Sequence, residues 1–341
     1  MKTLHIGGCD KFLPPLIELI KEEFDFNQHE FLLHSGMGKA PDYPNVKVYE
    51  RKIIERLKFY IFALLKMHRA DKVILHGLFD IKLVFILFFT PWLLRKCYWV
   101  MWGGDLYTHK LSEKNRKWKV KEFFRRTVIK NMGNLVTYIK GDVELARKWY
   151  GAKGQYHECI MYTSNLYKEY SVPSKQGTAI NIQVGNSADP SNNHLEALEK
   201  LLPFKSLDLC IYVPLSYGDK KHAQAVIQQG QQWFGDKFKP LTEFMPFDKY
   251  LSLLGTIDIA IFNHKRQQAM GNTITLLGLG KTVYIRNDVS QWQFFKNKNI
   301  VVGDVQKLSN LDALNIENNQ AKVKEYFSKE KLIEQLERLY Q

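Results

Sequence analysis

The chain has few cysteines and lacks several short motifs that would assign it to a common class. Its cysteines, Cys9, Cys97, Cys159 and Cys210, are far apart, form no C-x-x-C pair and have no matching histidine spacing. We therefore expect reduced, mostly buried thiols and neither disulfides nor zinc. The P-loop pattern is missing, as is G-x-G-x-x-G after the first predicted strand, so ATPase and dehydrogenase functions are disfavoured. An Asp-x-Asp metal motif is also missing, and we expect no metal and no cofactor.

Long hydrophobic runs are missing too. The most apolar run, Leu83–Leu94, has about half the length needed to span a bilayer and contains Pro91. A buried helix explains this run, although Lys82, Arg95 and Lys96 at its ends also suit a segment that lies in a membrane interface. The chain enters a strand pattern at its start, so we expect no signal peptide and a cytoplasmic protein.

Positive charge is plentiful and unevenly distributed. The net charge is +14 over 341 residues. Residues 1–165 hold 28 basic and 17 acidic side chains, a net +11, whereas residues 166–341 hold 21 and 18, a net +3. Two basic and apolar segments, Arg51–Arg69 and Lys110–Lys130, account for much of the excess. Such segments attract anionic surfaces, either lipid headgroups or nucleic acid; a nucleic-acid-binding α/β protein is the alternative, but charge alone does not select that partner.

Short apolar runs alternate with helical periodicity along the whole chain, which predicts parallel α/β sheets with helices on both faces. The alternation stops only at Tyr162–Gly177, where Ser, Pro, Lys and Gly gather, and we expect a linker there. The predicted domains are residues 1–165, residues 166–320, and a C-terminal helix in residues 321–341 that packs back on the first domain. Two such Rossmann-like domains would face each other across a ligand-binding cleft.

One stretch, Phe262–Ile285, combines features of an anion site. It follows an apolar run that predicts a buried strand, and its polar loop leads to Gly271, where a ligand could approach closely. We expect Asn272 or Thr273 to cap the helix that follows. The N-terminus of this helix could hold a phosphate, because its backbone N–H groups and its dipole favour negative charge. An ordinary βαβ unit is the alternative.

Three loops of the second half would leave the carboxyl ends of strands and offer donors for a nucleoside diphosphate. They are Gly185–Ser187, Pro214–Gly218 and Asn263–Gly271. A fourth loop, Glu243–Phe247, is a candidate for contacts with the nucleobase and ribose, together with Tyr217. The candidate donor-binding residues are Gly185, Asn186, Ser187, Tyr217, Met245, Arg266, Gln267, Gln268, Gly271, Asn272 and Thr273.

Three side chains of the first half follow predicted strands and could take a proton from an acceptor hydroxyl. They are Asp105, in Trp102-Gly103-Gly104-Asp105, then His76, and then Asp10, which lies beyond Gly7-Gly8. Each also has a structural explanation, since His76 could cap a turn, Asp10 could cap a helix and Asp105 could order the Gly-Gly turn.

These motifs together resemble a known family. Val184-Gly185-Asn186-Ser187 with Asp189, Ser191, Asn192 and His194, and Arg266-Gln267-Gln268 with Gly271, resemble the 4-acetamido-4,6-dideoxy-galactose (Fuc4NAc) transferases, glycosyltransferase family 56. His76-Gly77 and Trp102-Gly103 with Asp105-Leu106-Tyr107 fit the same family. The resemblance is dense from Val184 to Thr282 and around Trp102. Lys39–Arg69 and Lys110–Lys130 depart from it most.

The resemblance implies a GT-B fold and an inverting transfer from a dTDP-sugar to a polyprenyl-diphosphate-linked saccharide. Such a transfer takes place on the cytoplasmic side of the bacterial inner membrane, during surface-polysaccharide synthesis. Many retaining enzymes of this fold place Glu residues around the donor helix, whereas Gln267, Gln268, Thr275 and Leu276 occupy that region here. The basic first half would face an anionic membrane, and nucleic acid is the less favoured partner. A UDP-sugar donor, or an inactive sugar-nucleotide-binding homologue, is a further alternative.

Overall fold

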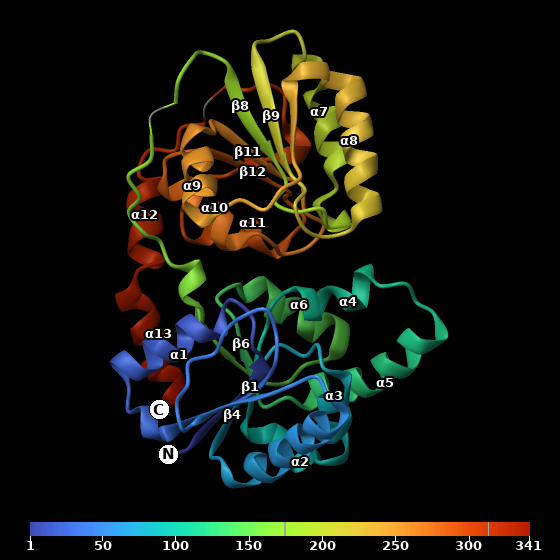
Figure 1. Cartoon of the computed structure of the whole chain (residues 1–341), viewed down its shortest axis with the longest axis vertical. Helices are drawn as coiled ribbons and strands as arrows, with labels where there is room; N and C mark the ends of the chain where they lie inside the picture. Colours follow the sequence, from blue (N-terminus) through green and yellow to red (C-terminus); the bar gives the residue numbers. More distant parts are fainter. Residues whose placement is uncertain (174, 313) are drawn as a thin grey trace. The chain divides into compact units, whose positions relative to one another are not determined.

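The computed structural model describes residues 1–173, 175–312 and 314–341, which form two α/β units (Figure 1). Unit 1 comprises Met1–Leu166 and Lys329–Gln341, and unit 2 comprises Tyr167–Ser328. Ser174, which belongs to the linker predicted from composition, lies outside the described residues.

Unit 1 contains a parallel sheet of seven strands in the order β3-β2-β1-β4-β5-β6-β7. Its strands are β1 (Thr3–Gly8), β2 (His29–His34), β3 (Val46–Tyr49), β4 (Lys72–His76), β5 (Cys97–Val100), β6 (Asn134–Val136) and β7 (Gln155–His157). Its helices are α1 (Leu13–Glu23), α2 (Ile53–Arg69), α3 (Ile81–Phe89), α4 (Gly104–Leu111), α5 (Arg116–Asn131), α6 (Lys140–Tyr150) and α13 (Lys329–Tyr340).

Strand alternation divides the core of unit 1 between the two faces of its sheet. Leu4 and Ile6 of β1 belong to one apolar cluster, which is completed by buried side chains of α2, α3, α5 and α6. His5, between them, points to the opposite face, where its ring stacks on Phe31. The aromatic ring of Tyr340 in α13 lies 4.6 Å from that of His29 on this second face. The C-terminal helix is therefore part of unit 1.

Unit 2 contains a parallel sheet of six strands in the order β10-β9-β8-β11-β12-β13. Its strands are β8 (Ile180–Val184), β9 (Leu209–Pro214), β10 (Phe238–Leu241), β11 (Ile259–Phe262), β12 (Thr282–Ile285) and β13 (Gly303–Asp304). Its helices are α7 (His194–Leu201), α8 (Lys220–Phe234), α9 (Phe247–Thr256), α10 (Met270–Gly278), α11 (Ser290–Asn297) and α12 (Asn319–Tyr326).

Each sheet has one topological switch point, where the strand order reverses. On one side of this point the strands follow the first strand of the sheet in one direction, and on the other side they are added in the opposite direction. In unit 1 this point lies between β1 and β4, and in unit 2 between β8 and β11. Ligands of open parallel sheets bind outside the carboxyl ends of the strands at such points, because the flanking loops turn to opposite sides there. Asp10 and His76 flank the first switch point, and Gly185 and Asn263 flank the second.

Three details differ from the sequence-based expectations. The C-terminal stretch forms two helices instead of one, because the chain breaks at Phe327-Ser328 between α12 and α13. The apolar run Leu83–Leu94 is also divided, into α3 and a 3-10 helix, Pro91–Lys96, because Pro91 cannot continue a helix. Tyr162, placed in the linker by composition, is a buried side chain of unit 1.

Within the described chain, no helix has both the length and the hydropathy that crossing a membrane requires.

Candidate functional site

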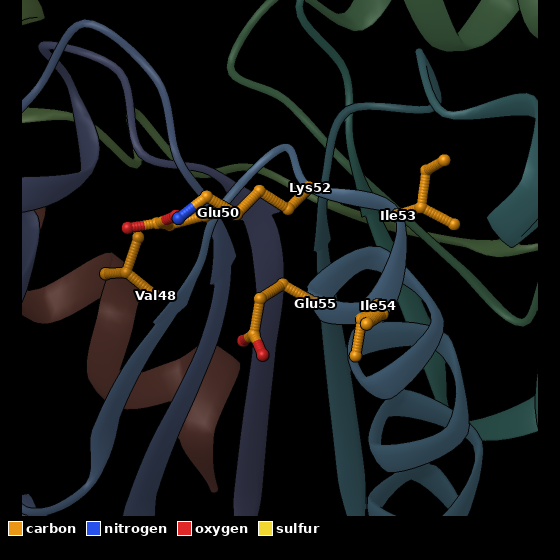
Figure 2. Close-up of a pocket in the computed structure, with 6 residues that line it drawn as sticks. All are labelled: Val48, Glu50, Lys52, Ile53, Ile54 and Glu55. Atoms are coloured by element: carbon orange, nitrogen blue, oxygen red, sulfur yellow. The ribbon is translucent and has the colours of Figure 1, made fainter.

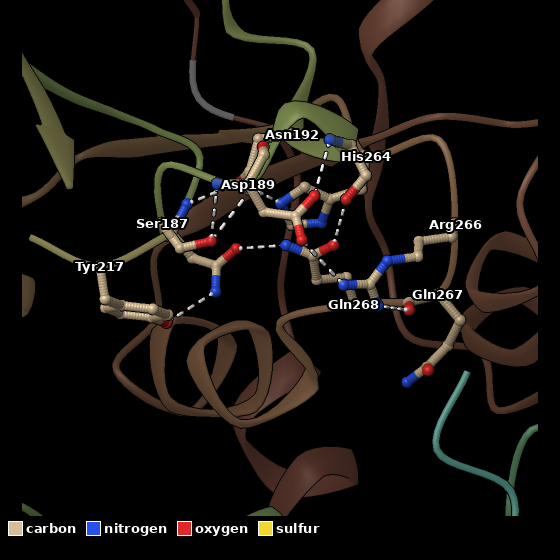
Figure 3. Close-up of polar contacts among 10 residues, drawn as sticks. Ser187, Asp189, Asn192, Tyr217, His264, Arg266, Gln267 and Gln268 are labelled. Carbon is tan, nitrogen blue, oxygen red and sulfur yellow. Dashed lines mark hydrogen bonds and ion pairs between the residues drawn. The ribbon is translucent and has the colours of Figure 1, made fainter. Parts of the chain in front are cut away.

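The three loops expected to bind the donor are tied together in unit 2 (Figure 3). Gln268, in the loop after β11, donates from Nε2 to Asn186 Oδ1 at 3.0 Å, and its Oε1 accepts from Ser191 Oγ at 2.7 Å. Asn186, in the loop after β8, donates from Nδ2 to the hydroxyl of Tyr217 at 3.4 Å. Side chains from the loops that follow three neighbouring strands, β8, β9 and β11, therefore meet at the switch point of the sheet.

Asn192 makes four contacts in this network, although it was not among the donor-binding residues predicted from the sequence. Its Oδ1 accepts from the backbone N–H of Asn186 at 2.9 Å and lies 2.9 Å from His264 Nε2. Its Nδ2 donates to Ser187 Oγ at 3.3 Å and to the carbonyl of Asp189 at 3.0 Å. A buried amide that both donates and accepts can fix the path of two loops at once. The signal in the sequence was its place among the residues that carry the family resemblance. Its burial could not be predicted, because periodicity does not reveal which loop residues are buried.

His264 is a second residue that was not predicted from the sequence, although it lies inside the stretch Phe262–Ile285. Burial lowers its pKa to about 3, so the ring is neutral at pH 7. Because Asn192 Oδ1 is an acceptor, His264 Nε2 carries the proton of the neutral ring. His194, in the same region, also has a pKa lowered to about 3 by burial.

Arg266 provides the positive charge of the site. Its guanidinium lies 3.6 Å from Asp189 Oδ2 and donates to the carbonyl of Gln267 at 3.1 Å. Burial raises the pKa of Asp189, but hydrogen bonds from Ser191 and the charge of Arg266 outweigh burial, and the net pKa is lowered. Asp189 is therefore ionised and holds Arg266 beside the network.

Helix α10 starts three or four residues earlier than a cap at Asn272 or Thr273 would place it, and it has no side-chain cap. The capping position is Ala269, which has a left-handed backbone with φ of 58° and makes no side-chain cap. Asn272 and Thr273 lie inside the first turn instead, and Thr273 Oγ1 donates back to the carbonyl of Ala269 at 3.0 Å. The expectation of an Asn or Thr cap is wrong, because the helix begins at Met270. Gly271 and Asn272 are half-buried.

Two glycines allow the loops to approach one another closely. Gly185 has φ of 70°, and a Cβ at that position would lie 2.5 Å from His194 Nε2. Gly218, with φ of 120°, lies against the backbone of Ala188, and a Cβ there would be 2.6 Å from the Ala188 carbonyl carbon. Only glycine fits at such positions. Met245, the remaining candidate, is half-buried in the loop before α9.

The three base candidates of unit 1 also lie at neighbouring strand ends, but in different environments. Asp105, in the first turn of α4, is fully buried. Its Oδ2 accepts from the indole N–H of Trp99 at 2.6 Å and the backbone N–H of Leu78 at 3.0 Å. Its Oδ1 accepts from the backbone N–H groups of Trp102 and Leu106, both at 3.0 Å. Asp105 thus ties together the loops that follow β4 and β5.

His76 belongs to a buried chain of rings. Its Nδ1 lies 2.7 Å from the hydroxyl of Tyr162, and its Nε2 lies 3.1 Å from His5 Nδ1. Trp102 Nε1 donates to the same hydroxyl at 2.8 Å, so the hydroxyl proton is free to point at His76 Nδ1. His76 Nε2 then donates to His5, whose Nε2 lies 3.1 Å from His29 Nδ1. Burial lowers the pKa of His76 to about 3, which agrees with a neutral ring that has both nitrogens in use.

Asp10 is the candidate with partial exposure. Its side chain is half-buried in the loop after β1, and Oδ1 accepts from the backbone N–H of Phe12 at 2.8 Å. Burial raises the pKa of Asp10 despite this hydrogen bond. A partly desolvated carboxylate is a stronger base than a solvated one.

Among residues 1–173, 175–312 and 314–341, no group of three or more His, Cys, Asp or Glu side chains is arranged to hold a metal ion.

Comparison with known proteins identifies the family to which this sequence is similar. The sequence profile of the family described as 4-alpha-L-fucosyltransferase, glycosyl transferase group 56, matches residues 16–330. Several solved glycosyltransferases share the fold. WaaG, a glycosyltransferase involved in lipopolysaccharide biosynthesis, matches with a TM-score of 0.63 at 12% identity over 99% of this chain and 98% of its own.

Two further structures extend the comparison. HepE of Anabaena, solved in complex with UDP and glucose, matches with a TM-score of 0.66 at 11% identity, over 100% of this chain and 99% of its own. Sucrose-phosphate synthase of Thermosynechococcus elongatus matches with a TM-score of 0.64 at 12% identity, over 100% of this chain and 98% of its own. The two parallel-sheet units are therefore those of the GT-B fold, as predicted from the sequence.

Proposed function

This chain belongs to group 56 of the glycosyltransferases, and we propose that it transfers a Fuc4NAc-like deoxy-acetamido sugar from a dTDP-sugar to a polyprenyl-diphosphate-linked saccharide. The transfer inverts the anomeric centre, needs no metal and serves bacterial surface-polysaccharide synthesis. The observation that carries the proposal is the hydrogen-bonded meeting of three loops at the switch point of unit 2, since that is where an open parallel sheet binds a nucleotide.

The donor diphosphate would bind between Arg266 and the first turn of α10. Arg266 is held in place by Asp189 and offers a guanidinium that can donate to two phosphate oxygens. No side chain caps α10, so the N–H groups of its first turn are available to an anion. Charge builds up on the leaving diphosphate in the transition state, and these fixed donors would stabilise it.

The other donor candidates would orient the nucleotide. Asn186, Ser187, Gln267 and Gln268 supply amide and hydroxyl groups around the diphosphate and the sugar. Tyr217 has an exposed ring beside this network, and Met245 lies in the loop before α9, so these two are assigned to the base and ribose. UDP is the alternative nucleotide, and HepE, which shares the fold, was solved with UDP.

For the base that deprotonates the acceptor hydroxyl, we place Asp10 first among the three candidates. Its carboxylate is partly exposed and its pKa is raised, whereas Asp105 is enclosed by four N–H donors and His76 uses both ring nitrogens. A single displacement with one carboxylate base gives inversion. Asp105 and His76 would then hold the loops that position the acceptor.

The acceptor is attached to a lipid, so the enzyme has to work at the cytoplasmic face of the inner membrane. Unit 1 has 31 basic and 20 acidic side chains, a net +11, and unit 2 has 18 and 15, a net +3. Anionic lipids attract clusters of Lys and Arg. We therefore assign the membrane-facing role to unit 1.

A nucleotide panel tests the donor proposal directly. A ligand at about 100 times its Kd adds about 2.7 kcal/mol, which raises the melting temperature of a domain this size by roughly 5–11 °C. We expect dTDP to stabilise the protein most, UDP less and GDP least. A stronger response to UDP would show that the donor is a UDP-sugar and not a dTDP-sugar. No response to any of the three nucleotides would refute the proposed function.

Turnover is tested with the donor and a lipid-linked acceptor, by measuring release of dTDP. Release that depends on the acceptor and persists in a chelator supports a metal-independent transfer. Nucleotide binding without turnover on any acceptor would indicate an inactive homologue instead.

A further inference from the structure

Helix α2 has apolar side chains on two opposite faces, and only one of these faces is covered. Phe59, Ala63 and Met67 point into the core of unit 1 and are fully buried. On the opposite side, Ile54 is 69% exposed and Ile61 is 50% exposed. An amphipathic helix normally presents polar side chains to solvent, so the outward face of α2 needs an explanation.

The exposed residues form a stripe along the helix. We use the name outer stripe for Ile54, Leu57, Ile61 and Leu65, which recur at intervals of three and four residues and are all exposed. Residues spaced in this way lie on the same side of an α-helix, one above the other. The outer stripe is thus about three turns long and continuous. A contiguous exposed apolar strip of this kind marks an interaction site.

Further exposed apolar side chains lie beside the outer stripe at both ends of the helix. Near the start of α2, Ile53 and Ile54 line a groove of about 880 Å³ together with Val48 of the edge strand β3 and the charged side chains of Glu50, Lys52 and Glu55 (Figure 2). Near the end, Trp92 is 59% exposed and donates from Nε1 to His68 Nε2 at 3.2 Å. An exposed tryptophan with a polar edge is typical of the boundary between lipid and water.

The charges beside the outer stripe identify the partner. Residues 50–69 carry six basic side chains and two acidic ones. Arg51, Arg56 and Arg69 are exposed, whereas Lys52 and Lys58 are ion-paired with Glu50 and Glu55. Two copies of α2 facing each other would bring these cations together and repel. An anionic lipid surface would neutralise them and also accept the apolar side chains.

From these observations we infer that α2 docks on an anionic membrane, with the outer stripe inserted at the level of the acyl chains and the flanking cations on the headgroups. The biological reason for docking rests on the proposed function, since a lipid-linked acceptor has to be reached there. From the sequence, a buried helix explained the apolar run Leu83–Leu94, and an interfacial segment was the alternative. Most of its large aliphatic side chains, such as Leu83, Leu87 and Leu93, are buried, whereas Phe89 and Trp92 are exposed.

The test uses the full-length protein and sedimentation with vesicles at about 0.15 M salt, where weak surface attraction is screened. The vesicles are phosphatidylcholine alone, or phosphatidylcholine with phosphatidylglycerol. The test variant is L57Q/I61Q/L65Q. The control is L207Q/V301Q, which removes exposed aliphatic side chains of unit 2. None of these residues belongs to the core, so both variants should fold.

We expect the wild type and the control to sediment with the anionic vesicles and to bind the neutral ones weakly. The stripe variant should bind the anionic vesicles at least about 10-fold more weakly, because three side chains lose their burial in lipid. Its melting temperature and its response to dTDP should match the wild type.

Three outcomes would overturn the inference. One is equal vesicle binding by the stripe variant and the wild type, and another is no binding by the wild type. The third is a wild-type dimer in light scattering that the stripe variant loses, since the stripe would then bind a second copy of the chain. The dTDP response separates this inference from the proposed function: vesicle binding that depends on the stripe stands even if no nucleotide binds.

Discussion

Replacing Asp105 by Asn tests whether this carboxylate holds the fold or performs the chemistry. Its two oxygens accept from the backbone N–H groups of Leu78, Trp102 and Leu106 and from the indole of Trp99. Asparagine is almost the same size but has one acceptor oxygen. Its amide group would point N–H donors at two of the four N–H groups that now donate to Asp105.

The cost follows from these contacts. Each buried donor left without an acceptor costs about 1–3 kcal/mol, so two cost about 4 kcal/mol together. For a unit of this size, about 4 kcal/mol lowers the melting temperature by roughly 8–16 °C. Asp10→Asn is the matched comparison, because the hydrogen bond that Oδ1 accepts from Phe12 N at 2.8 Å can also be accepted by an asparagine oxygen. We expect Asp10→Asn to shift the melting temperature by less than about 3 °C.

Calorimetry and turnover measured on both variants separate the two roles. If Asp10 is the base, Asp10→Asn should lose at least about 10²-fold in rate while keeping its stability and dTDP response. Asp105→Asn should lose stability first, and its remaining folded fraction should still bind dTDP through unit 2. A stable Asp105→Asn protein with the same large loss in rate would refute this reasoning and make Asp105 the base.

Three further predictions concern unit 2. Arg266→Gln should weaken dTDP binding about 10- to 100-fold in calorimetric titration, because charge-assisted hydrogen bonds to the diphosphate are lost. Gly185→Ala should destabilise unit 2 by at least about 2 kcal/mol in thermal unfolding, because a left-handed backbone and a contact with His194 are both unfavourable. His194 and His264 have folded pKa values of about 3, below the unfolded value of about 6.5, so the unfolded state takes up protons first as pH falls. The free energy of unfolding should therefore be highest above pH 6.5 and should fall below it, by up to about 1.4 kcal/mol per pH unit for each histidine. Urea unfolding at pH 7.5 and pH 5 measures this difference.

Matched variants give these predictions a baseline. Lys307→Gln removes an exposed cation of unit 2 and should leave dTDP affinity unchanged. Gly177→Ala introduces a Cβ at another glycine with positive φ, 84°, but no atom lies within 4 Å of it. Its cost should be smaller than that of Gly185→Ala, and equal costs would contradict the contact with His194. A urea midpoint that does not change between the two pH values would contradict the burial of neutral histidines.

Much of the donor region was predictable because its signals are local. A buried strand, a polar loop and a leucine-rich helix follow one another within residues 256–285, and the structure has β11, the loop and α10 there. Arg266 and Gln268 were therefore placed on the correct loop. The cap of α10 was predicted wrongly, because the choice between Ala269 and the residues after it depends on backbone angles that composition does not fix.

The hydrogen-bonded partners were not predictable to the same degree. Tyr162 lies next to His76 although 86 residues separate them, and composition placed Tyr162 in a linker. His264 and Asn192 are 72 residues apart, and nothing local in the sequence indicates that they meet. Such pairs arise only when distant strand ends meet, which depends on the strand order.

The sequence by itself determined the alternation of strands and helices, the basic first half and the loops that could bind an anion, because each depends on residues near one another in the chain. Only the tertiary structure decided the two switch points, the enclosure of Asp105 by four donors and the partial exposure of Asp10. It also decided which apolar face of α2 is covered. Helical periodicity shows that both faces are apolar, but only packing against the sheet determines that Phe59 is buried and Ile61 is left in solvent.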